Sequence, residues 1–232
     1  MQREGRFAAR LRCPANDLTI EVRGVGVLRF PLSAATARKL SSVARPAPFG
    51  LRERTLHNPN IRDTGQIQRS SVKIDRRRWK PVLQAHLAQI QRSLGLPAEG
   101  RLDAVLDKLL VYGPGQFFAP HKDSERSDDM IGTLTVELPS VYTGGAMLVA
   151  HGGQRKEFRR TAGSGKELTL LAFYADCTHE ARPVKSGWRV VLTYELHFRR
   201  ESVAKGPALP SPAIGPLSAS IAAYFDTLVP EP

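Results

Sequence analysis

The sequence predicts a mainly β domain with flanking helices, an α+β arrangement whose strands form a sandwich or a barrel. After Arg101 the chain alternates short apolar segments with the turn residues Gly144-Gly145, Gly152-Gly153 and Gly163-Ser-Gly165. Short strands separated by such turns are typical of sandwiches and barrels. Before Arg101 two segments have the sequence features of helices. The strand core is therefore expected in the second half of the chain.

Glycine-rich turns punctuate the series of expected strands. These strands cover residues 104–112, 117–121, 131–138, 146–150, 156–160, 167–174 and 188–198.

Two helices are expected to support this core. Ser33 is a suitable N-cap for a helix that ends near Val43. Pro81 fits the first turn of a second helix, which reaches about Leu94 and has apolar residues at helical spacing. The other elements expected here are a frayed basic stretch at 1–12, a hairpin of strands at 18–22 and 27–30, and a strand at 71–74.

Residues 49–70 are polar and loop-like, and they are long for a connection inside a compact domain. Loops of this length are usually functional or disordered, so we expect a lid over a substrate site. Arg52, Arg54 and Arg62 in this segment either bind acidic groups of a substrate or are solvated charges. His57 and Arg62 are the candidate substrate contacts.

The 232 residues, of which 41% are hydrophobic, are expected to form one domain with a substantial core. Within it we expect N-terminal support at 1–100, a catalytic core at 101–200, and a tail at 201–232 that is rich in Pro, Ala and Ser. The tail allows one terminal helix at 217–228.

Lys and Arg outnumber Asp and Glu by 34 to 22, which gives a net charge of +12. This charge favours acidic partners or nucleic acid without choosing between them. The only two cysteines are Cys13 and Cys177, and the N-terminus lacks the apolar run of a signal peptide, so we expect a cytoplasmic location. No apolar run approaches the roughly 20 residues that cross a bilayer, so no membrane association is expected. The oligomeric state is not predicted.

The candidate metal site begins with His121-x-Asp123. Residues i and i+2 of a strand point to the same side, so these two side chains can converge on one cation, with Lys122 pointing away. A third ligand is found in His179, within a segment expected to form a strand, a turn and another strand. Two histidines and one carboxylate form the facial triad of non-haem Fe(II) oxygenases, which leaves coordination positions open.

A family resemblance covers residues from about 107 to 198. It rests on Tyr112 before a Gly-rich turn, PHKD at 120–123, GTLTVELPS at 132–140, Gly144-Gly145, AFYADCTHE at 172–180 and GWRVVLTYEL at 187–196. In these motifs the chain resembles the Fe(II)- and 2-oxoglutarate-dependent dioxygenases, in their prolyl 4-hydroxylase-like branch. The resemblance implies a double-stranded β-helix, or jelly roll, with iron at its open mouth.

The resemblance also implies the roles of single residues. Fe(II) would be held by His121, Asp123 and His179, with 2-oxoglutarate and O2 as co-substrates. Arg189 lies ten residues after His179, where the family places the Arg or Lys that binds the far carboxylate of 2-oxoglutarate, and a guanidinium grips a carboxylate through two hydrogen bonds. Hydroxyl hydrogen bonds to the same co-substrate are assigned to Tyr112, Thr135 and Thr193.

The implied reaction is hydroxylation of an unactivated C–H bond, coupled to decarboxylation of 2-oxoglutarate to succinate. The substrate would be a peptidyl or free proline, or another small molecule. Asp123 favours hydroxylation over halogenation, because halogenating relatives have a small residue at this position. An alternative is nucleic-acid dealkylation, but Glu195 stands where those relatives have a second Arg, so nucleic acid is not the expected partner.

A different class of alternative is a cupin-type or purely binding jelly roll that uses no 2-oxoglutarate. Such a protein would not need Arg189 at its spacing from His179, and a non-catalytic module would be expected to lose a ligand or this Arg. Cys177 is expected to be a small buried side chain. Surface or structural roles are expected for His57, His86, His151 and His197.

Overall fold

The computed structural model describes residues 7–51, 54–56, 58–123, 127–160 and 165–200. The chain divides into two units, Met1–Arg200 and Glu201–Pro232. The second unit lies outside the described residues, and so do the helix expected at 217–228 and the candidate substrate residue His57. No helix in the described part of the chain is long and apolar enough to span a bilayer.

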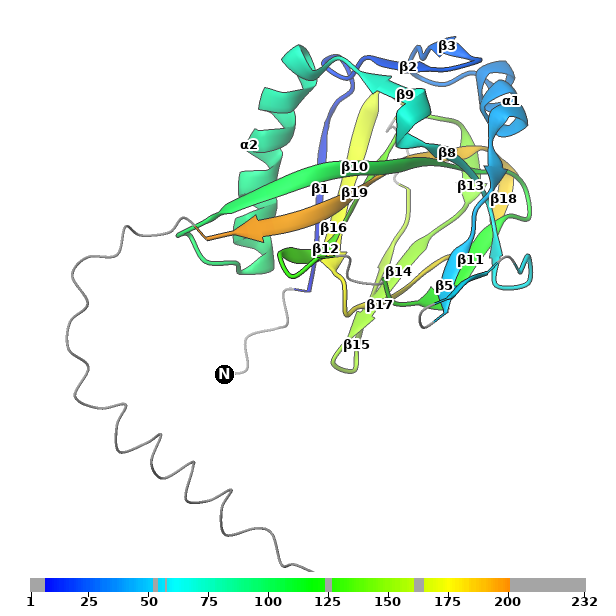
Figure 1. Ribbon diagram of the computed structural model, residues 1–232. Helices are drawn as coiled ribbons and strands as arrows, with labels where there is room; N and C mark the ends of the chain where they lie inside the picture. Colours follow the sequence, from blue (N-terminus) through cyan, green and yellow to red (C-terminus); the bar gives the residue numbers. More distant parts are fainter. Residues whose placement is uncertain (1–6, 52–53, 57, 124–126, 161–164, 201–232) are drawn as a thin grey trace, which may run out of the picture. The chain divides into compact units, whose positions relative to one another are not determined.

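Two antiparallel sheets form the body of the first unit (Figure 1). The larger sheet has, in spatial order, β1 (Ala8–Pro14), β16 (Glu167–Tyr174), β12 (Met130–Glu137), β19 (Arg189–Arg199), β10 (Arg101–Tyr112), β8 (Gly65–Gln68) and β4 (Arg45–Pro46). The smaller sheet has β15 (Gln154–Phe158), β14 (Met147–His151), β17 (Thr178–Ala181), β11 (Phe117–His121) and β7 (Arg62–Asp63).

Strands from the second half of the chain are distributed between these two sheets. Strands β10, β12, β16 and β19 lie in the larger sheet, whereas β11, β14, β15 and β17 lie in the smaller one. The chain thus passes repeatedly from one sheet to the other, which is the winding of a double-stranded β-helix. The prediction of a mainly β jelly roll with flanking helices is confirmed.

The larger sheet buries both of its faces. Because successive side chains of a strand alternate between faces, Tyr112 and Phe173 point into the barrel, whereas Leu109 and Leu134 point to the outside. The outer face is covered by helix α2 (Arg76–Leu94), which lies beside β1 and β10 in Figure 1. The buried residues of α2 are Trp79, Leu83, Leu87, Ile90 and Leu94. The predicted supporting role of this helix therefore agrees with its packing.

The start of helix α2 differs from the prediction. The helix begins at Arg76, five residues before Pro81, and the Asp75 side chain caps it by accepting from the Arg77 amide at 3.0 Å. Burial explains this extension, because Trp79 packs into the core and its indole N–H donates to the Tyr194 hydroxyl at 3.3 Å. Pro81 is accommodated inside the helix. The predicted helix after Ser33 is confirmed as α1 (Ala34–Val43), with Ser33 as its N-cap.

The N-terminal stretch, expected to be frayed, is a strand from Ala8 onward. This strand, β1, pairs with β16 along its whole length and forms one edge of the larger sheet. Ala9 and Cys13 are buried, while Arg10 and Arg12 are exposed. The alternation of a β-strand was thus present in the sequence. It was not recognised because the exposed positions carry basic residues.

Several short strands fall where loops or turns were expected. Residues 49–70 contain a hairpin of β5 (Phe49–Leu51) and β6 (Arg54–Leu56), then β7, β8 and the start of a 3-10 turn (Arg69–Ser71), so this segment is only partly a loop. Strands β13 (Tyr142–Gly144), β17 and β18 (Val184–Gly187) were not predicted. The predicted hairpin and strand near the N-terminus are confirmed as β2 (Ile20–Val22), β3 (Gly26–Val27) and β9 (Val72–Ile74).

Packing of α2 on the larger sheet should supply a substantial part of the stability. Ile90 is 0% exposed, so Ile90→Ala should lower the free energy of unfolding by about 2–5 kcal/mol, since it removes buried methyl groups and leaves a cavity. Val141 is 75% exposed, and Val141→Ala is the control, with a change below about 0.5 kcal/mol. Urea unfolding followed by circular dichroism measures both. Equal effects of the two substitutions would contradict the packing described for α2.

Candidate metal centre

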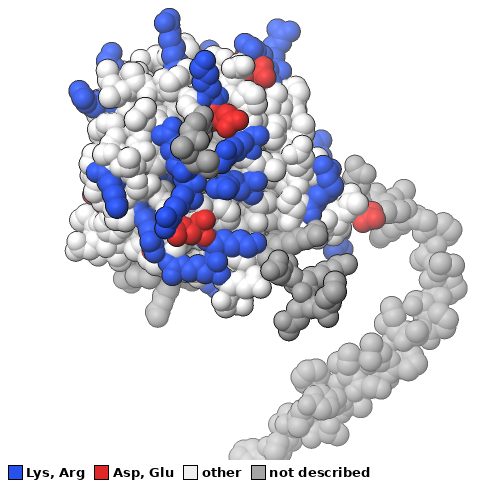
Figure 2. Space-filling model, turned by 180° about the vertical axis from the view of Figure 1, so that it is seen from behind, with Lys and Arg blue, Asp and Glu red and all other residues white. Residues whose placement is uncertain are grey.

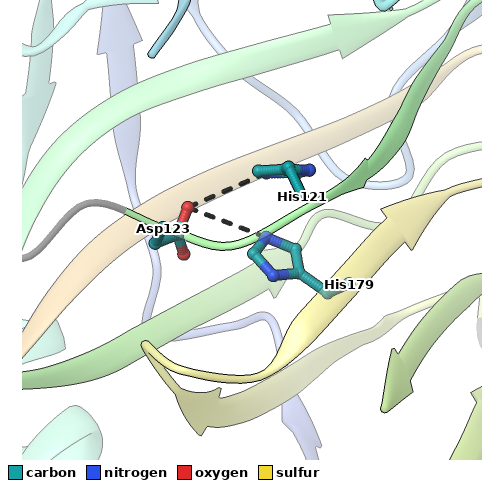
Figure 3. Close-up of side chains that lie close together, drawn as sticks. All are labelled: His121, Asp123 and His179. Atoms are coloured by element: carbon teal, nitrogen blue, oxygen red, sulfur yellow. Dashed lines mark ion pairs between the residues drawn. The ribbon is translucent and has the colours of Figure 1, made fainter. Parts of the chain in front are cut away.

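The three predicted metal ligands lie together at one end of the barrel interior (Figure 3). His121 ends β11 and pairs in register with His179 on the adjacent strand β17. Asp123 follows two residues after His121, and its Oδ1 lies 3.8 Å from His121 Nε2 and 3.7 Å from His179 Nε2. Lys122 is exposed, as expected for the residue between two inward-facing ones. The sheet register thus brings together His121 and His179, which are 58 positions apart in the chain.

Backbone carbonyls set the orientation of both imidazole rings. His121 Nδ1 lies 2.9 Å from the Ala119 carbonyl oxygen, and His179 Nδ1 lies 3.2 Å from that of Cys177. Since a carbonyl can only accept, each Nδ1 carries the proton and each Nε2 has a lone pair directed toward Asp123. Burial, together with the neighbouring His179, lowers the pKa of His121 to about 3. His121 is therefore a neutral ligand at physiological pH.

Asp123 is held by a residue that the sequence analysis did not identify. The Thr133 hydroxyl on β12 donates to Asp123 Oδ2 at 2.5 Å, which leaves Oδ1 facing the two histidines. Hydrogen bonds of this kind to the outer atoms of a metal ligand fix its orientation. The partner of Asp123 could not be chosen between Thr133 and Thr135 from the sequence alone, because both lie on the same face of one strand.

The geometry of the three side chains fits a single metal ion. Donors bound to one first-row ion lie about 2.0–2.2 Å from it, so two such donors are at most about 4.4 Å apart. The measured distances of 3.7 and 3.8 Å satisfy this limit. Two imidazole nitrogens and one carboxylate oxygen suit a non-haem iron centre with open positions. The residues therefore fit Fe(II).

Aromatic rings and one arginine surround the ligands. Phe118 stacks on His121 with ring centroids 3.5 Å apart, and Phe173 lies 4.5 Å from the ring of His179. Arg62 lies over Phe118, 4.3 Å from its centroid, and donates to the Pro48 carbonyl at 2.6 Å. The buried Arg62 Nε has no hydrogen-bond partner among the described residues. The structure therefore places the predicted substrate residue Arg62 beside the candidate metal centre.

Arg189 lies deeper in the barrel, at the start of β19. Its side chain is only 3% exposed, and its guanidinium carbon is 5.3 Å from the centre of the Tyr112 ring. Arg189 Nε donates to Glu137 Oε2 at 3.2 Å, and the Tyr142 hydroxyl donates to Glu137 Oε1 at 2.5 Å. Burial acts to lower the pKa of Arg189, but Glu137 and the two tyrosines outweigh it and raise the pKa. Sequence reasoning missed Glu137, which lies in the motif GTLTVELPS but was assigned no role there.

The two predicted threonines lie between the candidate metal ligands and Arg189. Thr135 and Thr193 are register partners on β12 and β19. In the described structure the Thr135 hydroxyl donates to the Leu171 carbonyl and that of Thr193 to the Lys108 carbonyl, both at 3.3 Å. Thr135 lines the same narrow pocket as Arg189, whereas the co-substrate contacts assigned to both threonines and to Tyr112 stay predictions.

A second group of ligand-type side chains was not expected. His151 was taken to lack suitable neighbours, but its ring, the Asp176 carboxylate and the Cys177 thiol lie within 4.8 Å of one another. Cys177 is buried, as predicted; burial raises its pKa to about 11, and its thiol faces the Phe7 carbonyl. His86 and His197 have structural partners, with Nδ1 2.7 Å from the Val82 carbonyl and 3.1 Å from Asp129, respectively.

A family match covers the strands that carry this site. Residues 108–197 match the family described as the 2OG-Fe(II) oxygenase superfamily, and this span includes the three ligands and Arg189. The strands of residues 108–197 thus belong to the 2OG-Fe(II) oxygenase superfamily. The resemblance inferred from the sequence motifs is thereby confirmed at the level of the superfamily. No curated protein matches the chain.

Solved structures similar to this superfamily member include prolyl hydroxylases. A Pseudomonas putida prolyl-4-hydroxylase is 19% identical, with a TM-score of 0.44 over 84% of this chain and 93% of its own. A Trichoplax adhaerens prolyl hydroxylase, solved with a peptide fragment of hypoxia inducible factor, is 15% identical, with a TM-score of 0.46 over 78% and 84%. A Burkholderia pseudomallei oxidoreductase of the 2OG-Fe(II) oxygenase family is 16% identical, with a TM-score of 0.43 over 70% and 78%.

The hydrogen bond from Thr133 to Asp123 should contribute to metal affinity in this oxygenase-family protein. Thr133→Val keeps the side-chain shape but removes the donor, so we expect Fe(II) or Mn(II) to bind about 10- to 100-fold more weakly. Anaerobic calorimetry with either ion measures the change. Thr143→Val is the control, because Thr143 is exposed and its hydroxyl contacts Ser186. Unchanged metal affinity after Thr133→Val would show that the hydrogen bond to Asp123 does not contribute to metal binding.

Proposed function

We propose that this protein is an Fe(II)- and 2-oxoglutarate-dependent dioxygenase that hydroxylates an unactivated C–H bond. In the same turnover 2-oxoglutarate would lose CO2 and become succinate. The observation that carries the proposal is the convergence of His121, Asp123 and His179 at one end of a barrel whose interior also holds the buried Arg189. Membership in the 2OG-Fe(II) oxygenase superfamily supports it.

Each residue of the site would have a separate role in this reaction. Iron and 2-oxoglutarate, when bound, supply the oxygen-activating chemistry. The Nε2 atoms of His121 and His179 and Oδ1 of Asp123 would hold the ion, and a centre with three protein ligands would have positions open for co-substrate and oxygen. Arg189 offers a buried guanidinium to the far carboxylate. Phe118 and Phe173 limit water around the two histidines.

The substrate we propose is a peptidyl or free proline, or another small molecule with polar groups. A polar groove lies beside the metal site, because Glu195 in its lining pairs across strands with Thr133, which holds Asp123. The groove is lined by Gln66, Gln68, Arg69, Ser70, Leu106, Asp107, Lys108 and Glu195. An anionic group on the substrate would suit Arg62, whose buried Nε lacks a partner in the described part of the chain.

Two other functions fit the described residues less well. For nucleic-acid dealkylation, Glu195 stands where those relatives have a second Arg. For a cupin-type protein without 2-oxoglutarate, Arg189 would have only its partner Glu137, and a buried ion pair by itself contributes little to stability. Arg189 therefore favours a co-substrate that carries a carboxylate.

The first test is an anaerobic titration of the apo-protein with Fe(II) and then with 2-oxoglutarate. We expect the weak visible charge-transfer band of the chelate, and release of succinate when air is admitted. Asp123→Ala should abolish both, with little change in thermal unfolding, because an open metal site contributes little to the stability of a core this large. Metal binding without the band in the wild-type protein would favour the cupin-type alternative.

The carboxylate anchor can be tested separately. Arg189→Ala should raise the 2-oxoglutarate concentration needed for half-saturation by about 100-fold, since a buried carboxylate would lose its paired charge. The charge-transfer band measures this at constant Fe(II). Iron affinity should stay the same, because Arg189 is not one of the three ligands. An unchanged 2-oxoglutarate affinity would assign the anchor to another residue.

A further inference from the structure

The anchor Arg189 already has a carboxylate partner inside the protein. Glu137 accepts from Arg189 Nε with one oxygen and from the Tyr142 hydroxyl with the other. Both oxygens of Glu137 are therefore engaged, and the guanidinium is held from its Nε side. The buried pair of one guanidinium and one carboxylate has no net charge.

This pairing creates a charge problem for the proposed co-substrate. When the far carboxylate of 2-oxoglutarate reaches Arg189, the site would contain two carboxylates and one guanidinium. A buried charge without compensation costs several kcal/mol. A second cation near Glu137 would remove this cost.

The residue that provides a second cation near Glu137 is Arg160, two residues after the end of β15. Its guanidinium carbon lies 5.1 Å from the centre of the Tyr142 ring, the same tyrosine that donates to Glu137. Arg160 also lines the narrow pocket that contains Thr135, Glu137 and Arg189.

Two other arginines outside the barrel interior line this pocket, and both are exposed. Arg159 forms two hydrogen bonds with Glu157, at 2.9 and 3.1 Å. Arg10 donates to the Arg159 carbonyl at 3.2 Å. More broadly, basic side chains gather around a few acidic ones on the face shown in Figure 2. Of the three pocket arginines outside the barrel interior, Arg160 is the one placed against the Tyr142–Glu137 pair.

We propose that Arg160 is a second cationic residue of the co-substrate site. Together with Arg189 it balances the charges of Glu137 and of the far carboxylate of a bound dicarboxylate. Arg160 then acts on specificity, because only a 2-oxo acid with a second carboxylate needs the additional charge. This inference rests on the proposed function and adds a selectivity-determining residue to it.

The test compares Arg160→Gln with Arg155→Gln. Arg155 is on the same strand region, but it is exposed and faces Glu180 at 3.5 Å. Dissociation constants are measured anaerobically, from the charge-transfer band with Fe(II) and by calorimetry with Mn(II). Arg160→Gln should weaken 2-oxoglutarate binding about tenfold, which corresponds to one charge-assisted contact. Arg155→Gln should leave it unchanged, and both variants should bind metal as the wild type does.

Two further measurements separate charge balance from a structural effect. Pyruvate is a 2-oxo acid without the second carboxylate, so its affinity should be the same in the wild type and in Arg160→Gln. The double variant Glu137→Gln/Arg160→Gln should regain most of the lost 2-oxoglutarate affinity. Glutamine keeps the size of Glu137 and one acceptor oxygen for Arg189, and its NH2 group can donate to the Tyr142 oxygen, but it removes the charge. Recovery would therefore show that the loss was one of charge.

The outcomes distinguish this inference from the proposed function. Failure of the wild-type protein to bind 2-oxoglutarate would overturn the proposed function and the inference with it. Normal wild-type binding with an unchanged Arg160→Gln would overturn only the inference. A loss that affects pyruvate equally, or that the double variant does not recover, would also overturn it.

Discussion

The interior of the barrel depends on the two-residue period of β12. Thr133, Thr135 and Glu137 share the inward face of this strand, and each serves a different part of the site. Thr133 holds the candidate ligand Asp123, and Glu137 holds the buried Arg189. At about 3.4 Å per residue, the Cα atoms of Thr133 and Glu137 are about 14 Å apart. One strand thus sets the separation between the metal end and the anchor, and Thr135 lies between them.

The site residues with a motif could be predicted from sequence, and their supporting residues could not. His121-x-Asp123 is informative because the spacing itself fixes the relative direction of two ligands on a strand. No spacing within the sequence indicates the partners of Glu137 and Thr133. Their roles come from partners on other strands, Arg189 and Asp123, and a single sequence does not contain that register. His179 is intermediate, since its residue type indicated a ligand but the strand β17 that carries it was expected to be a turn.

The errors in the fold have a similar origin. The alternation of buried and exposed residues in β1 was not recognised, because its exposed positions carry Arg10 and Arg12. The segment was therefore interpreted as a frayed, basic terminus. The sheet edge it completes is formed with β16, more than 150 residues later. Helix α2 was started too late because Pro81 was given more weight than the burial of Trp79. In both cases tertiary contacts decided a boundary that local preference left open.

The two ends of the barrel interior differ in net charge. At the metal end, a divalent ion held by one carboxylate and two neutral imidazoles would have a net charge of +1 and would attract the carboxylate of a 2-oxo acid. At the base, the charges of Arg189 and Glu137 cancel, so attraction for the far carboxylate would require a contribution from outside the pair. If the proposed function holds, coordination would suffice to bind any 2-oxo acid, whereas a second carboxylate would be recognised only if Arg160 completed the charge balance. Selectivity for a dicarboxylate would then reside at the end of the barrel away from the metal.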